Sequence, residues 1–297
     1  MSTVFTMIKR NVKLFFKDQG MFFSALITPA ILLVLYTTFL DNVFRESFEA
    51  NLPENLHLPE KLLNGLVGGQ LVSSLLAVSC VTVAFCANFL MVQDKATGSI
   101  RDLRISPVKA SVLSVSYYFA TLISTLLICF AATGLSLLYL AKVGWYLSVS
   151  DVLFLLLDVF ILVMFGTALS SIINFFLSTQ GQISAVGTII SSGYGFICGA
   201  YMPISTFGEG LQKVLAFLPG TYGTSLVRNH AMGGALAEMQ RCGIPAAEIE
   251  SIRDSLDCNL YFFGERVGIP TMYGILIGTV LVLLGVYILL NAVKKRP

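Results

Sequence analysis

The sequence is poor in charge. Charged residues make up 12% of the 297 residues, whereas hydrophobic residues make up 56%. Soluble proteins contain about 25% charged residues, and a chain of this length cannot bury so much apolar surface in a core surrounded by water. Helices that face lipid need no such core. The composition therefore predicts a membrane protein and excludes a soluble enzyme.

Motifs that carry chemistry are also missing. The chain has no G-x-x-x-x-G-K-[ST] loop, so it cannot cradle the phosphates of ATP by that route. It has no C-x-x-C pair, and its two histidines, His57 and His230, lie far apart in segments that we expect to be external loops. We therefore expect no metal, no cofactor and no catalytic triad in this chain. A net charge of +2, with no basic run containing aromatics, argues against a nucleic-acid partner.

Apolar runs long enough to cross a bilayer recur along the chain. About 20 helical residues span a hydrocarbon core of about 30 Å. Six runs reach this length, at about 20–40, 65–92, 111–141, 152–178, 182–201 and 268–292. The predicted fold is an all-α polytopic membrane protein, with residues 1–297 forming a single transmembrane domain.

Residues 3–19 predict an amphipathic helix before the first span. Its basic residues, which include Lys9 and Lys13, and its apolar residues fall on opposite faces at helical spacing. Such a helix lies along a membrane surface. The alternative, the basic start of a signal peptide, is disfavoured because the run that follows is long enough to span and lacks a small-residue cleavage site.

The distribution of Lys and Arg predicts the orientation. These residues concentrate in the N-terminal helix, in the loop at 93–110 and in the C-terminal tail, whereas most acidic residues lie in the other loops. Positive residues favour the cytoplasmic side. We therefore expect an inner-membrane protein with both termini in the cytoplasm and with segments 41–64 and 202–267 outside.

The segment 202–267 breaks the pattern of spans. Residues 203–228 are too apolar for a solvated loop and too interrupted by proline to span, which predicts a re-entrant pair of short helices followed by a polar external cap. Cys242 and Cys258 lie in that cap. They could form a disulfide outside the cell or remain two free thiols, and their spacing does not decide between these alternatives.

Asp158 is the one carboxylate well within a predicted span. An ionised Asp in lipid costs on the order of 3 kcal/mol, so its side chain should face protein or water. A structural hydrogen bond is the favoured reading, because Asp158 lies near the outer interface and no cationic partner is visible in the sequence. Contact with a cationic cargo or transport of a proton are the alternatives.

The loop at 93–107 is the most informative stretch. Gly98 can end the long second helix, Ser99 can cap a short new helix, and Pro107 can end that helix before the third span. Ile100 and Leu103 would then offer apolar contacts beside basic residues. The pattern is compatible with a docking helix or with a basic loop that only fixes topology.

The order of motifs resembles that of the type-2 ABC exporter permeases. An acidic residue, Gly-Ser, Leu and Ser-Pro stand between the second and third of six spans, and Gly199 to Pro203 are followed by a Pro, a Tyr and an Arg. The family usually has a Glu-Arg-type pair where this chain has Asp94 and Lys95. The amphipathic start and the missing ATPase also agree, so the resemblance covers essentially the whole chain.

The resemblance implies two permeases driven by two separate ABC ATPase subunits that bind ATP and Mg. The second and fifth spans would line the pathway, and the second permease is expected to be an identical copy rather than a different chain. Residues that would contact the ATPase are Lys9, Lys13, Asp94, Gly98, Ser99, Arg101, Leu103, Arg104 and Pro107. Residues that would line the pathway or its outer exit are Asp158, Gly195, Gly199, Pro203, Pro219 and Tyr222.

The expected cargo is a hydrophobic drug, antibiotic, peptide or lipid-like molecule, an expectation that rests on the family resemblance. The main alternative is an ion-coupled secondary transporter that uses Asp158. That class usually has duplicated halves and several ionisable groups within the membrane, and here one such group and no repeat are found. A membrane scaffold is a third possibility.

Overall fold

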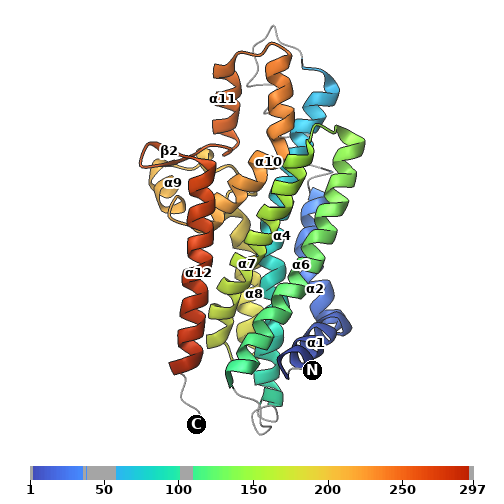
Figure 1. Ribbon diagram of the computed structural model, residues 1–297, viewed down its shortest axis with the longest axis vertical. Helices are drawn as coiled ribbons and strands as arrows, with labels where there is room; N and C mark the ends of the chain where they lie inside the picture. The colour runs from blue at the N-terminus through green and yellow to red at the C-terminus, as the bar shows by residue number, and fades with distance from the viewer. Residues whose placement is uncertain (1–2, 36–37, 39–57, 101–109, 294–297) are drawn as a thin grey trace.

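The computed structural model describes residues 3–35, 38, 58–100 and 110–293, and the helices form an elongated bundle (Figure 1). Its elements are α1 (Thr3–Lys17), α2 (Gln19–Leu35), α4 (Glu60–Ala96), α6 (Ala110–Val143), α7 (Val149–Phe176), α8 (Gln180–Ile197), η2 (Ile204–Thr206), α9 (Glu209–Leu215), α10 (Pro219–Arg241), α11 (Ala246–Ser255), β1 (Leu260–Phe262), β2 (Glu265–Val267) and α12 (Ile269–Val293). Four predicted contact residues lie outside the described residues, namely Arg101, Leu103, Arg104 and Pro107.

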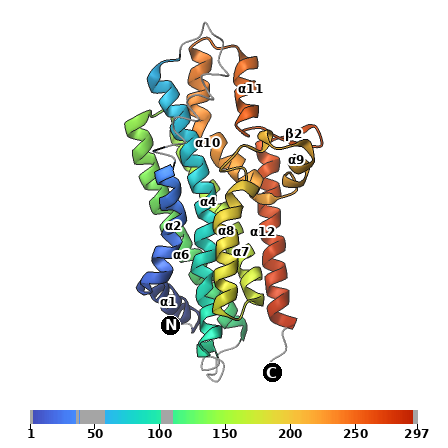
Figure 2. The ribbon, with the colours of Figure 1, turned by 180° about the vertical axis from the view of Figure 1, so that it is seen from behind.

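Among the described residues, four helices are long and apolar enough to cross a membrane, namely α4, α6, α7 and α12, and the bent pair α1–α2 could add a fifth span. Both views place α1 and the last turns of α12 at the same end of the bundle and α11 at the opposite end (Figures 1 and 2). The chain therefore begins and ends its helical path at one end of the bundle.

The sequence predicts six spans, and the remaining two are α2 and α8. Helix α2 is described only to Leu35, which leaves 17 residues. Helix α8 has 18 residues but carries Gln, Ser, Thr and Gly along its length, so its composition does not qualify it as a span. Both helices nevertheless run along the bundle beside α4 (Figure 2).

Helix α4 is the central element. Its 37 residues form a helix about 55 Å long, well beyond the thickness of the hydrocarbon core. It packs against α2, α6, α7, α8 and α10 and is buried along most of its length. A movement at its C-terminal end, beside α1, is therefore transmitted to most of the bundle.

Helix α1 meets α2 at an angle of 72°, so it lies across the end of the bundle as an interfacial helix would. Met7, Asn11 and Phe15 form the buried strip of α1, at spacings of four residues. Phe5 and Phe16 remain exposed beside it and are available to lipid.

The segment before α12 differs from the prediction. Helix α10 runs unbroken from Pro219 to Arg241 and packs against α4, α7 and α12, whereas the sequence predicts two short helices ending near Arg228. The helix continues because apolar residues recur at helical spacing on one face, which is buried: Ala231, Met232, Ala235, Leu236 and Met239.

The all-α prediction also misses a small hairpin. Strands β1 and β2 pair antiparallel, with Leu260 opposite Val267, and Phe263 and Gly264 form a turn with φ of 50° and 89°. Both turn residues have positive φ, as the tightest two-residue hairpin turns require.

The two cysteines of the cap are free thiols. Cys242 is exposed at the end of α10, whereas Cys258 is buried behind α11. Burial raises the pKa of the Cys258 thiol to about 11. A disulfide between them is therefore not formed in this structure, and their reactivities should differ strongly.

Candidate functional site

The C-terminal end of α4 is tied to α1 and α6 by one carboxylate. Asp94 is buried, and its Oδ2 accepts a hydrogen bond from Arg10 Nη1 at 3.0 Å and another from the hydroxyl of Tyr117. Met7 and Leu113 join a small apolar cluster beside this contact. The sequence predicts Asp94 as a contact for a partner, but its carboxylate points inward and connects three helices.

Lys95 ties the same end of α4 to α7. Its ammonium donates to the backbone oxygens of Asn174 and Phe175 at 2.9 Å and of Leu177 at 3.0 Å. The last carbonyls of a helix lack partners within the helix, and a cation there also faces the negative end of the helix dipole. Asp94 and Lys95 therefore attach α4 to α1, α6 and α7 within two residues.

The chain changes direction immediately after these two residues. Gly98 has a φ of +83° and lies two residues beyond the last residue of α4, the position at which a left-handed glycine commonly ends a helix. Residues 99–100 are helical, so a new helical segment begins at Ser99. Ser99 thus lies inside the new segment instead of capping it, and its hydroxyl lies 3.0 Å from that of Thr97.

Lys9 and Lys13 lie on the exposed side of α1, close in the chain to the Arg10 contact. Arg10, which belongs to the same basic face in the sequence, turns back to Asp94 instead. The end of the bundle at α1 thus presents exposed lysines and the corner at Gly98, and both lie close in the chain to residues that contact or include Asp94.

A groove of about 1030 Å³ runs between α2 and α8, with α4 forming its floor. Its walls are mainly apolar, and Asp18 is its one charged lining residue among the described residues. Gln93 and Gln180 line it near the end of α4 and the start of α8, whereas Tyr201 and Met202 line it beyond the end of α8.

Helix α8 presents a polar face at this groove. Ser184, Thr188 and Ser192 are spaced by four residues and are exposed or line the groove. The exposed side of α12 carries large apolar residues instead: Leu281, Val282, Ile288 and Leu289. Because lipid favours apolar side chains, α12 faces lipid, whereas the face of α8 suits water or another protein surface.

The turn after α8 is held by a buried arginine. Gly199 has a φ of +75°, and its carbonyl accepts a hydrogen bond from Arg228 Nη2 at 2.9 Å. Arg228 Nη1 donates to the carbonyl of Leu256 at 2.6 Å and lies 3.4 Å from Asp257 Oδ2. One side chain on α10 thus joins the end of α8 to the segment after α11.

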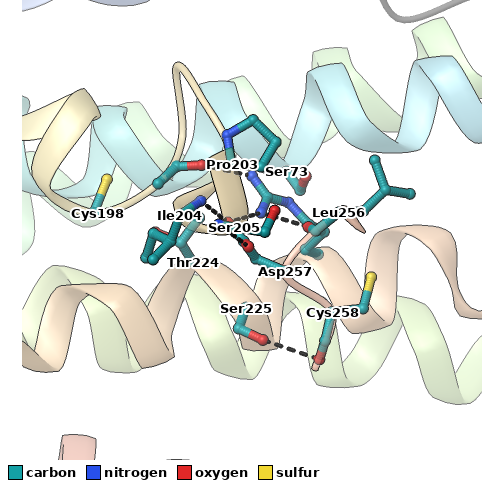
Figure 3. A network of polar contacts seen from close by, with 12 residues as sticks. Ser73, Cys198, Pro203, Ile204, Ser205, Thr224, Ser225, Leu256, Asp257 and Cys258 are labelled. Carbon is teal, nitrogen blue, oxygen red and sulfur yellow. Dashed lines mark hydrogen bonds and ion pairs between the residues drawn. The ribbon is translucent and has the colours of Figure 1, made fainter. Parts of the chain in front are cut away.

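Asp257 completes this network from the other side. Its two oxygens accept from the backbone N–H groups of Ile204, at 2.5 Å, and Ser205, at 3.2 Å, so the carboxylate sits at the start of η2 (Figure 3). Burial raises the pKa of Asp257 above the ordinary carboxyl value, and the charge of Arg228 and the two N–H groups oppose that rise.

A family model described as ABC-2 type transporter matches residues 2–231, which is most of the chain. The chain belongs to the ABC-2 type transporter family. It is a multi-pass membrane permease, a subunit without catalytic function of its own, and such permeases generally pair with an ABC ATPase. The match ends within α10, so α11, the hairpin and α12 lie outside it. No curated protein matches the chain.

Except for Asp158, the residues predicted to line the pathway or its outer exit lie between the last turns of α8 and the first turn of α10. A Cβ on Gly195 would lie 2.3 Å from the ring of Tyr201, so this glycine allows the tyrosine to fold back on α8. Pro203 precedes η2, and Pro219 is the first residue of α10. The hydroxyl of Tyr222 donates to the carbonyl of Ala216 at 2.5 Å, which holds the connection between α9 and α10.

Asp158 lies in a separate cluster away from the permease groove. Its carboxylate contacts His230 Nδ1 on α10 at 2.6 Å and accepts a hydrogen bond from the hydroxyl of Tyr273 on α12. His230 also stacks on Phe154, with ring centroids 5.1 Å apart. The sequence does not reveal this imidazole partner of Asp158, and the expectation that His230 lies in an external loop is wrong because α10 extends past residue 228 and brings the imidazole to α7.

Proposed function

We propose that this chain is the permease subunit of an ATP-driven exporter and that it receives movement from a separate ABC ATPase at the corner formed by Gly98. The observation that carries the proposal is the position of Asp94 and Lys95. They lie directly before the corner and connect α4 to α1, α6 and α7. A displacement applied beyond Gly98 is therefore distributed to four helices at once.

The ATPase would bind ATP and Mg, and this chain would carry no cofactor. The exposed Lys9 and Lys13 and the segment 98–107 would form the contact surface, with the Arg10–Asp94 ion pair behind it. Closure of two ATPase subunits on ATP would move this surface. The bundle would then rearrange without any bond chemistry in the permease itself.

The transport pathway would form between two copies of this chain. The polar face of α8 and the groove beside it lie on the surface, which favours a homodimer in which two such faces enclose the pathway. In this arrangement α2 and α8 would be the remaining two of six membrane spans, and both termini would lie in the cytoplasm. The largely apolar groove walls favour export of a hydrophobic or lipid-like cargo, such as a drug, an antibiotic or a hydrophobic peptide.

The proposal is tested by purifying the tagged chain in mild detergent and by measuring ATP hydrolysis and transport after reconstitution. We expect two copies of the chain with two copies of a P-loop ATPase, and transport that stops when the phosphate-binding lysine of that ATPase is replaced. Transport by the purified chain alone would contradict the proposal.

An ion-coupled transporter is the second candidate, favoured by the buried contact between Asp158 and His230. The change that separates the two is Asp158→Asn. An amide can still accept the hydrogen bond of Tyr273, so under the exporter hypothesis the variant loses about 1 kcal/mol of stability and keeps ATP-driven transport. Transport assays with ATP present measure this.

Asp158→Leu is the matched control, because it leaves the His230 and Tyr273 groups without partners and should lower stability more than the asparagine does. A folded Asp158→Asn protein that binds its ATPase but no longer transports would favour ion coupling over the exporter hypothesis.

A further inference from the structure

An exposed apolar patch lies outside the helical bundle, on α9 and the hairpin. It consists of Leu211, Val214, Phe217, Phe262 and Phe263, which we call the cap patch. Phe263 is 67% exposed and Phe217 is 61% exposed. The three rings contact one another, with centroids 5.1 Å apart for Phe217 and Phe262 and 4.9 Å apart for Phe262 and Phe263.

The patch is built from two unrelated elements. Leu211, Val214 and Phe217 follow one another at three-residue spacing, so they share one side of α9 and the turn after it. The hairpin brings Phe262 and Phe263 to the end of that side. Single exposed apolar residues scattered over a surface are common and need no explanation. A contiguous patch of exposed aromatic residues from two elements, in contrast, marks an interaction surface.

The position of the patch indicates its partner. Both views show α9 and β2 projecting sideways at the first turns of α12, level with its start (Figures 1 and 2). Ile269, two residues after the hairpin, begins α12, whose large exposed residues are apolar. The elements that carry the cap patch therefore lie at the end of a helix that faces lipid.

Charge is arranged as an interfacial segment requires. Glu209 and Lys213 lie on α9 away from the apolar positions, and Arg266 on β2 pairs with Glu250 of α11. The two strands of the hairpin pair with each other, and their outward-facing backbone groups can bond to water at the headgroup level. An element with an apolar side and charged flanks can therefore enter the headgroup region at little cost.

We propose that the cap patch is a membrane anchor, which holds the external cap in the lipid leaflet at the α9 end of the bundle. The anchored hairpin follows Asp257, whose carboxylate holds the start of η2 after Gly199. The anchor therefore fixes the turn after α8 relative to the bilayer surface as well as relative to the bundle.

The test uses the single tryptophan of the chain, Trp145. With Trp145→Phe as background, Phe263→Trp and Phe217→Trp are two separate reporters, and Gln240→Trp, an exposed position at the far end of α10, is the matched control. The full chain is reconstituted in nanodiscs of phosphatidylcholine brominated high or low on its acyl chains, and tryptophan fluorescence is compared with that in unbrominated lipid.

Both reporters are expected to lose roughly half of their fluorescence, more with bromine near the headgroup, because an interfacial segment sits about 5–10 Å deep. Gln240→Trp should be unaffected. If neither reporter is quenched more than Gln240→Trp, the proposal is wrong, and a blue-shifted but unquenched reporter would assign the patch to a protein partner. The experiment measures how deeply these side chains lie in the bilayer. Its result therefore does not depend on the proposed orientation of the chain or on the proposed ATPase.

Discussion

Gly98→Pro is expected to lower ATP-driven transport at least about tenfold while the complex with its ATPase still assembles and hydrolyses ATP. Proline fixes φ near −65°, whereas Gly98 has a φ of +83°, and proline also removes the N–H that Gly98 donates to the carbonyl of Lys95. The change therefore redirects the segment beyond α4 without touching the helix core. Transport and hydrolysis are measured on the same reconstituted sample.

Gly98→Asn is the control for this prediction. Asparagine tolerates the left-handed region better than other residues with a side chain, and a Cβ at this position would meet no atom within 4 Å among the described residues. We therefore expect Gly98→Asn to retain most of the transport. Equal loss in both variants would mean that bulk at this position matters and the direction of the chain does not.

Arg228→Met is expected to lower the free energy of unfolding by about 3–5 kcal/mol, the usual cost of removing one partner from a buried ion pair. The methionine fills much of the volume but leaves Asp257 buried opposite it, and the carbonyls of Gly199 and Leu256 lose their donor. Thermal unfolding of the detergent-solubilised chain measures the loss.

Arg241→Met provides the same substitution at an exposed pair. Arg241 is 78% exposed and contacts Glu238 one turn earlier, a pair worth about 0.5 kcal/mol or less. The double variant Arg228→Met with Asp257→Asn should recover part of the stability, because no unpaired charge then remains buried. An Arg228→Met protein as stable as Arg241→Met would show that the contacts of Arg228 with Gly199, Leu256 and Asp257 do not hold the turn after α8.

Local patterns in the sequence predict the bundle well, because a span is encoded by a continuous apolar run. The runs at 111–141, 152–178 and 268–292 lie within α6, α7 and α12 to within a few residues. The break at Gly98 is equally local, since a glycine directly after a long helix can adopt the left-handed conformation that ends it, wherever the helix packs. The amphipathic character of α1 follows from spacing alone.

The contacts that make these elements a permease are not local. Arg10 and Asp94 are 84 residues apart, and nothing in the basic face of α1 distinguishes Arg10 from Lys9 or Lys13. The sequence predicts a polar cap after Arg228 because the apolar residues there are interspersed with Gly, Glu, Gln and Arg, although that part of α10 is a helix whose apolar face is buried. The contact between His230 and Asp158 follows from that burial and could not be predicted without it.

The hairpin was missed for a different reason. Its turn consists of Phe263 and Gly264, and an aromatic residue at positive φ carries none of the usual Asn-Gly or Asp-Gly signal. Its strands have three residues each, too short for a period of two to be seen. Phe262 and Phe263 therefore fall in the segment predicted as a polar cap, whereas Leu211, Val214 and Phe217 fall in the segment predicted as a re-entrant pair of helices.

The central claim, that movement enters this permease from the cytoplasm at the corner after α4, is tested most directly by sidedness. Ser99→Cys places a thiol at that corner, and Cys242, exposed at the end of α10, is a natural marker for the opposite end, whereas Cys258 is buried and should not react. A membrane-impermeant maleimide should label Cys242 but not the thiol introduced at position 99 in intact cells, and the reverse in inverted vesicles. Labelling of position 99 from outside intact cells would contradict the account.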